Sequence, residues 1–146
     1  IYNHYMKRDN NINLKLFVVL NKCNITVGRK SEKTIKPTGL TIPQFSVLEI
    51  LYNKGDLKVG DIIEKSLSTV GNISLVIDNL CKLGYTEKKK CTLDKRITYV
   101  TLTTNGRNLM DSMWEAHIEE MDNIMSTLNL EEKETLIKLL KKLGKS

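Results

Sequence analysis

Residues 66–106 read SLSTVGNISLVIDNLCKLGYTEKKKCTLDKRITYVTLTTNG, and they predict a helix followed by a β hairpin. The helix runs from about Val70 to Leu83, because apolar side chains recur there at helical intervals. These apolar positions are Ile73, Val76, Ile77 and Leu80. Gly84 then provides a natural C-terminal cap. Two segments of strand character follow, at 85–91 and 97–103, and the polar residues between them predict the turn of a hairpin.

A shorter helix is predicted just before this stretch, over residues 59–66, with Ile62 and Ile63 facing the core. Residues 66–69 are small and polar apart from one leucine, and they indicate a tight break. Two short helices joined in this way form a helix-turn-helix. A hairpin that directly follows a helix-turn-helix is a wing.

Further helices are predicted on the N-terminal side. Thr41 and Gln44 have the spacing of a capping box, with Pro43 in the first turn of the helix. Residues 8–30 are predicted to form an amphipathic helix, and residues 29–39 are predicted to form a polar connection. The apolar stripe of that first helix is Ile12, Leu16, Val19, Cys23 and Val27.

The C-terminal side is predicted to hold two helices. The first is long and has apolar residues at three- and four-residue intervals from Leu109 to Leu128. Asn129 and Glu132 then form a second capping-box pattern, and the last helix carries the stripe Leu136, Leu139, Leu140 and Leu143. The fold class is therefore mainly α with a small β hairpin: a winged helix-turn-helix core flanked by N- and C-terminal helices.

The amino-acid composition indicates a globular protein. The 146 residues are 40% hydrophobic and 27% charged, which is typical of a globular domain. No apolar run approaches the roughly 18 residues of a membrane span, and the first residues do not resemble a signal peptide. The three cysteines form no CxxC pair, which favours a reducing compartment. We expect a cytoplasmic protein without a membrane partner; the numbering begins at Ile1, which leaves room for residues before it.

Charge is distributed unevenly along the chain, whose formal net charge is +6. Residues 1–58 carry a net +6 and residues 82–107 a net +5, whereas residues 108–146 carry a net −3. This distribution favours a polyanion as the partner of the basic segments. There is no Gly-rich phosphate loop, no Ser/His/Asp order and no set of metal ligands, so we expect no catalytic residues, no cofactor and no metal site.

The candidate DNA-binding residues fall into two groups. Hydroxyl and amide side chains near the start of the second helix can bond to phosphates and base edges, and a leucine there can contact a thymine methyl. These residues are Ser68, Thr69, Asn72, Ser74 and Leu75. The wing supplies the cations Lys88, Lys89, Lys90, Lys95 and Arg96. Asp94 is predicted to orient the guanidinium of Arg96 through a bidentate pair, which would suit a narrow minor groove.

From Leu40 to Asp111 the chain resembles the MarR (multiple antibiotic resistance regulator) family. Four pieces carry the resemblance, in the order and spacing of the family. They are Leu40-Thr41-x-x-Gln44-Phe45-x-Val47-Leu48, Thr69-x-Gly71-x-Ile73-Ser74-x-Val76-Ile77-Asp78-x-Leu80, Leu83-Gly84-Tyr85, and Asp94-Lys95-Arg96 with Val100-x-Leu102-Thr103-x-x-Gly106.

The resemblance implies a homodimer whose end helices interleave. Residues 1–38 would hold the N-terminal dimerisation helix and its connection, 39–103 the DNA-binding lobe, and 104–146 the long helix and the C-terminal dimerisation helix. It also implies a repressor of transcription. Such a repressor binds a pseudo-palindromic operator in double-stranded DNA and releases it when a small aromatic or phenolic effector binds between the dimer helices and the lobe.

Two other functions remain open on the sequence. One is a redox-sensing regulator that acts through Cys23, because some relatives sense peroxides through a cysteine on that helix. The other is a winged-helix adaptor whose basic wing binds an acidic protein. Cys81, Cys91 and His117 are predicted to be packing residues.

Overall fold

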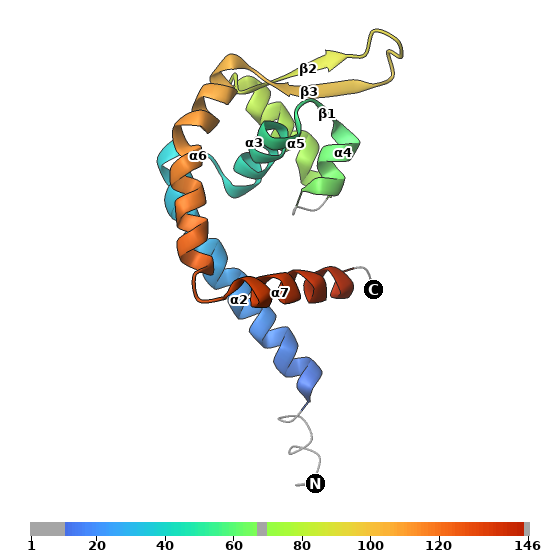
Figure 1. Cartoon of the computed structure of the whole chain (residues 1–146). Coiled ribbons are helices and arrows are strands. Elements are labelled where there is room, and N and C mark those ends of the chain that lie inside the picture. The colour runs from blue at the N-terminus through green and yellow to red at the C-terminus, as the bar shows by residue number, and fades with distance from the viewer. Residues whose placement is uncertain (1–10, 67–69, 145–146) are drawn as a thin grey trace, which may run out of the picture. The chain divides into compact units, whose positions relative to one another are not determined.

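The computed structural model describes residues 11–66 and 70–144 (Figure 1). The described residues form, in order, α2 (Ile12–Ile35), the 3-10 helix η1 (Lys36–Thr38), α3 (Ile42–Lys54), β1 (Leu57–Lys58), α4 (Val59–Lys65), α5 (Val70–Lys82), β2 (Thr86–Lys90), β3 (Thr98–Leu102), α6 (Thr104–Met125) and α7 (Leu130–Leu143). The predicted mainly helical fold with a small β hairpin is confirmed.

The chain divides into two compact units. One comprises residues 32–119, and the other combines the chain up to residue 31 with the chain from residue 120 onward. The boundaries fall inside α2 and α6, so each of these helices contributes to both units.

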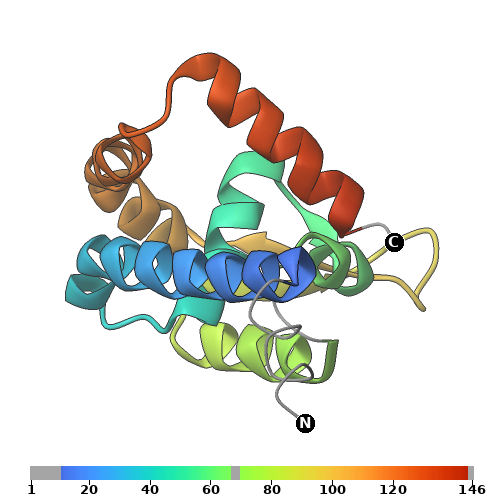
Figure 2. The same ribbon diagram turned by 90° about the horizontal axis from the view of Figure 1, so that it is seen from below.

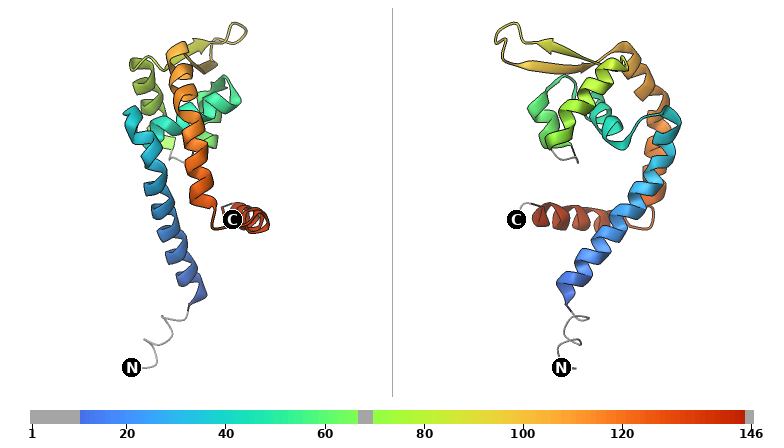
Figure 3. Two further views of the ribbon diagram at one scale, coloured as in Figure 1. Left: turned by 60° about the vertical axis from the view of Figure 1, so that its left-hand side comes forward. Right: turned by 180° about the vertical axis from the view of Figure 1, so that it is seen from behind.

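The first unit, residues 32–119, contains a small antiparallel sheet with strand order β1-β3-β2. Strands β2 and β3 pair from Thr86 opposite Leu102 to Lys90 opposite Thr98. Their hairpin extends beyond the helices of this unit (Figures 1 and 3). Strand β1, which pairs Leu57 with Val100, was not predicted, because two residues are too short to show a strand pattern in the sequence.

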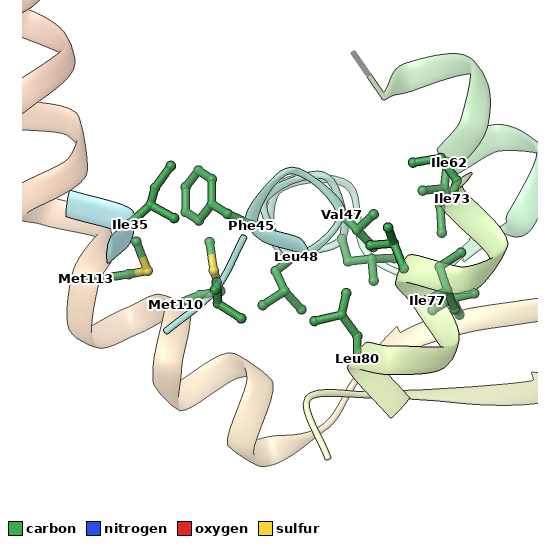
Figure 4. Close-up of a cluster of buried hydrophobic side chains, with 14 residues drawn as sticks. Ile35, Phe45, Val47, Leu48, Ile62, Ile73, Ile77, Leu80, Met110 and Met113 are labelled. Carbon is green, nitrogen blue, oxygen red and sulfur yellow. The ribbon is translucent and has the colours of Figure 1, made fainter. Parts of the chain in front are cut away.

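Helix α3 lies at the centre of the hydrophobic core of this unit. Figure 4 shows Phe45 of α3 directed toward Ile35 and Met113. On the other side, Val47 is directed toward Ile77 of α5. The predicted capping box at the start of α3 is confirmed: the Thr41 side chain accepts from the Gln44 backbone N–H, and the Gln44 side chain accepts from the Thr41 backbone N–H.

The backbone at the base of the wing lies close to the start of α6. The Thr103 hydroxyl donates to the Gly84 carbonyl over 2.6 Å, and the Thr103 backbone N–H donates to the Tyr85 carbonyl over 3.1 Å. Gly106, in the first turn of α6, has no Cβ; one built there would lie 2.1 Å from the Tyr85 carbonyl oxygen. Gly84 itself has φ = +76°, a conformation that glycine adopts without strain.

Helix α7 belongs to the other unit and begins after a short turn from α6 (Figure 2). The predicted cap is confirmed, because Asn129 Oδ1 accepts from the Glu132 backbone N–H over 3.0 Å. In return, the Asn129 backbone N–H donates to Glu132 Oε2 over 2.9 Å.

The prediction that residues 29–39 form a connection is wrong for most of that segment. Helix α2 continues to Ile35, where the side chain is only 3% exposed and packs in the core. The segment is polar, but it has no helix breaker before Pro37. An ion pair of 3.3 Å between Glu32 and Lys36, four residues apart, also favours the helical conformation.

Candidate nucleic-acid interface

Helix α5 has one buried face and one exposed face. Ile73, Ile77 and Leu80 are fully buried, as the helical spacing predicted. Ser74, Leu75 and Asp78 are exposed, and because they are three and four residues apart they lie on one side of the helix. The buried side anchors α5 to the core and leaves the other side open to a partner.

The link between α4 and α5 lies outside the described residues. Two of the predicted DNA contacts, Ser68 and Thr69, are in this link. Asn72 belongs to the first turn of α5, but its side chain is also outside the described part of the chain. The predicted contacts Ser74 and Leu75 are both solvent-exposed, and Leu75 is 56% exposed.

Strand β2 carries the three consecutive lysines of the wing, and all three are exposed. Side chains alternate between the two faces of a strand, so Lys88 and Lys90 share the face of the buried Thr86, and Lys89 lies on the opposite face. Lys89 pairs with Glu87 on its own strand at 2.8 Å, and this hydrogen bond raises the pKa of Lys89.

Lys88 pairs with helix α5. Its Nζ lies 2.6 Å from Asp78 Oδ1 of α5. This hydrogen bond and the positive charge of Lys88 lower the pKa of the Asp78 carboxyl. The ion pair therefore connects the wing to the exposed side of α5.

The predicted bidentate pair at the wing tip is present. Arg96 Nε and Nη2 donate to the two carboxylate oxygens of Asp94 over 3.1 and 3.0 Å. The Arg96 backbone N–H also donates to Asp94 Oδ1 over 3.0 Å. The side-chain bonds and the backbone bond lower the pKa of Asp94, and the side-chain bonds raise the pKa of Arg96. The guanidinium is thereby oriented, although the Arg96 side chain remains 91% exposed.

Lys90 and Lys95 complete the predicted cations of the wing. Both are exposed, and within residues 11–66 and 70–144 neither takes part in an ion pair. They are therefore the wing lysines that remain available to an anion.

Sequence reasoning missed three charged residues of this surface. Asp78 and Glu87 pair with lysines that were predicted to contact DNA. Asp78 and Lys88 are ten residues apart on different elements, so their spacing gives no sign of the pair, whereas the two-residue spacing of Glu87 and Lys89 on one strand face could have indicated theirs. Lys58 lies on β1 opposite Tyr99, and its charge contributes to the lowered pKa of Asp94. It could not be placed beside the wing because β1 itself was not predicted.

The cysteines lie in three different environments. Cys23 of α2 is exposed, whereas Cys81 and Cys91 are half-buried. The Cys81 sulfur lies 3.3 Å from the Thr86 hydroxyl, in agreement with a packing role. Hydrogen bonds from the backbone of Asp94 and Leu93 lower the pKa of the Cys91 thiol.

His117 of α6 is buried at 6% exposure, as predicted. Its Nδ1 lies 2.8 Å from the Thr34 hydroxyl, and its ring centroid is 4.7 Å from that of Phe45. Burial lowers the pKa of His117. The side chain thus joins α2, α3 and α6 within the 32–119 unit.

The part of the chain that the structure describes holds neither a metal-binding cluster nor a membrane-spanning helix. No group of three or more His, Cys, Asp or Glu side chains there is arranged to hold a metal ion. None of the described helices combines the length and the apolar character that crossing a bilayer requires.

Known proteins resemble this chain in sequence. The MarR family profile matches residues 40–98. Over 131 residues the chain is 34% identical to the HTH-type transcriptional regulator MhqR of Bacillus subtilis, and the match covers 90% of each protein.

Solved structures resemble it in fold. A mutant MarR from E. coli complexed with operator DNA superposes with a TM-score of 0.80 at 23% identity, covering 91% of this chain and 96% of that one. BpsR of Bordetella bronchiseptica, whose DNA binding is regulated by 6-hydroxynicotinic acid, superposes with a TM-score of 0.77 at 24% identity, covering 89% of this chain and 98% of that one. These neighbours have the winged helix-turn-helix fold.

Proposed function

The chain belongs to the MarR family of helix-turn-helix transcriptional regulators, and from this premise we propose that it is a homodimeric repressor that binds a pseudo-palindromic DNA operator. Helix α5 would enter the major groove and the wing would contact the flanking minor groove. Its relatives are transcriptional regulators rather than enzymes, and we expect no catalytic activity.

One observation carries the DNA-binding part of the proposal. The open side of α5, with Ser74 and Leu75, and a basic wing with an oriented Arg96 belong to the same compact unit. Side chains on a groove-entering helix can read base edges, and an arginine in a narrow minor groove gains from its strong negative potential. The E. coli structure bound to operator DNA supports this use of the fold.

Exposed apolar residues on the end helices support a dimer. Helix α2 exposes large apolar side chains on most of its circumference, a pattern that is stable only when the helix is covered. They are Ile12, Leu14, Leu16, Phe17, Val18, Val19 and Ile25. Helix α7 exposes Leu136, Ile137, Leu139, Leu140 and Leu143. A second copy of the chain would remove this surface from water.

In the proposed repressor, a small effector controls the release of DNA. The regulation of BpsR by 6-hydroxynicotinic acid supports a small aromatic compound as the effector class. The test is to titrate phenolic and pyridine carboxylate compounds into the protein–operator complex and measure DNA release by fluorescence anisotropy. If none releases DNA, this part of the proposal fails, whereas the DNA-binding part stands.

A thiol switch at Cys23 is a second candidate for the control step, favoured by the exposure of that residue. Treating the protein–operator complex with mild peroxide tests it. A switch predicts loss of DNA binding in the wild type and no loss in Cys23→Ser. Equal responses of the two proteins reject it.

The experiment for the central proposal is selection of bound duplexes from random sequence, followed by a salt titration on the selected duplex. A dimer that makes about 6–10 phosphate contacts loses roughly three to five decades of affinity between 50 and 200 mM salt. A palindromic consensus with this salt dependence supports the repressor. Failure to enrich any duplex, with a salt-independent signal, favours the adaptor that binds an acidic protein.

A further inference from the structure

Asp78 carries a negative charge on the side of α5 that is open to a partner. It shares this side with Ser74, four residues earlier, and Leu75, three residues earlier. A carboxylate on a DNA-facing helix repels the phosphates of the backbone unless a cation neutralises it.

Lys88 of β2 neutralises this carboxylate. The 2.6 Å distance between Lys88 Nζ and Asp78 Oδ1 is that of a short charge-assisted hydrogen bond. Both side chains are partly exposed, 39% for Lys88 and 51% for Asp78, so the pair lies at the surface where α5 and β2 meet. The partners are ten positions apart in the sequence, and they belong to different elements.

Lys90 provides an internal comparison. It is two residues from Lys88 and on the same face of β2, nearer the wing tip. Within the described residues it has no ion-pair partner. Two lysines of the same strand face thus differ in their partners: Lys88 is engaged by Asp78 of α5, and Lys90 is available to a phosphate.

We propose that Asp78 is a positioning residue for DNA recognition: it holds Lys88 away from the phosphates and ties the wing to the recognition helix. This inference rests on the proposed DNA-binding function. A free Lys88 would add a contact to a phosphate. Such a contact carries no sequence information, because every duplex has the same phosphate backbone. The pair therefore favours the operator over other DNA by withholding one non-specific contact per subunit and by fixing the wing relative to α5.

The test uses four variants of the full-length chain: Asp78→Asn, Asp78→Glu, Lys88→Gln and Lys90→Gln. Affinity is measured for the selected operator and for an unrelated duplex at 50, 100 and 200 mM salt. Each phosphate contact that is gained or lost changes the slope of log affinity against log salt by about 0.9. One contact per subunit therefore changes the slope by about 1.8 per dimer. Circular dichroism and thermal melting of each variant check that it is folded.

Asp78→Asn frees Lys88, so its slope on the unrelated duplex should steepen by about 1.8. Its preference for the operator over the unrelated duplex should fall. Asp78→Glu keeps a carboxylate within reach of Lys88 and should retain the wild-type slope and preference. Lys88→Gln should leave the slope unchanged, whereas Lys90→Gln should make it shallower by about 1.8.

Two results would overturn the inference: a shallower slope for Lys88→Gln equal to that of Lys90→Gln, or a wild-type slope and preference for Asp78→Asn. The first would make Lys88 an ordinary phosphate contact, and the second would give Asp78 no role. Failure of the underlying function is recognised separately, because the wild-type protein itself would then show no salt-dependent DNA binding.

Discussion

Gly106 lies where α6 crosses the base of the wing. In a helix, alanine is favoured over glycine by about 1 kcal/mol. A Cβ at this position would, however, lie 2.1 Å from the Tyr85 carbonyl oxygen, which is backbone and cannot turn away. Gly106→Ala should therefore destabilise the protein by about 1–3 kcal/mol, measured by urea denaturation. Gly60→Ala is the control in α4, where nothing lies within 4 Å of a built Cβ; it should not be destabilising, and equal losses for both variants would contradict the steric argument.

Arg96 combines a positive charge with a fixed planar geometry. Arg96→Ala should weaken binding to most duplexes and reduce the salt slope by about one per subunit, because a phosphate-region cation is lost. Arg96→Lys keeps the charge but cannot form the two parallel bonds to Asp94. It should keep most of the salt slope and lose preference for A·T-rich flanks. The measurement is a binding titration on duplexes that differ only in these flanks, and an unchanged preference in both variants would place Arg96 outside the minor groove.

At the scale of the element, α2 has too much exposed apolar surface for a helix in water. Leu16 is 54% exposed and lies on the predicted stripe. Leu16→Glu would place an unpaired charge in the proposed dimer interface, which costs several kcal/mol, so the variant should be monomeric at micromolar concentration. Lys22→Glu should remain dimeric, because Lys22 lies with Lys15 and Arg29 on a basic strip of α2 in which the three residues recur at seven-residue intervals. Light scattering of all three proteins is the measurement, and a monomeric wild type would refute the proposed dimer.

At the scale of the whole molecule, the buried His117 makes stability depend on pH. Burial lowers its pKa below the ordinary value of 6.5, so at pH values below about 6.5 the unfolded chain binds a proton that the folded chain resists. This contribution to stability is present above pH 6.5 and is lost as the pH falls toward the lowered pKa. We expect the free energy of unfolding to decrease from pH 7.5 to 5.5 in the wild type. His117→Gln, which retains a group able to bond to Thr34, should show a smaller decrease; identical profiles would mean that His117 does not titrate as its burial implies.

Much of this fold follows from local patterns. The apolar spacing of α5, the capping boxes at Thr41 and Asn129, and the strand character of 97–103 each depend on neighbours within a few residues, and all were predicted correctly. The Asp94–Arg96 pair was predicted for the same reason, since its partners are two residues apart. The polar residues 29–39 predict a loop, but α2 continues to Ile35, because the side chain of Ile35 packs in the core.

Contacts between residues that are far apart in the sequence could be identified only from the tertiary structure. Asp78 meets Lys88, and Thr34 meets His117 across 83 residues, because the packing of helices and sheet brings these backbones together. Charge alone could not separate Lys88 from Lys90, since both look like free cations in the sequence. Local periodicity therefore suffices to predict which elements form, whereas the availability of each cation for DNA depends on which acidic side chain the fold places beside it.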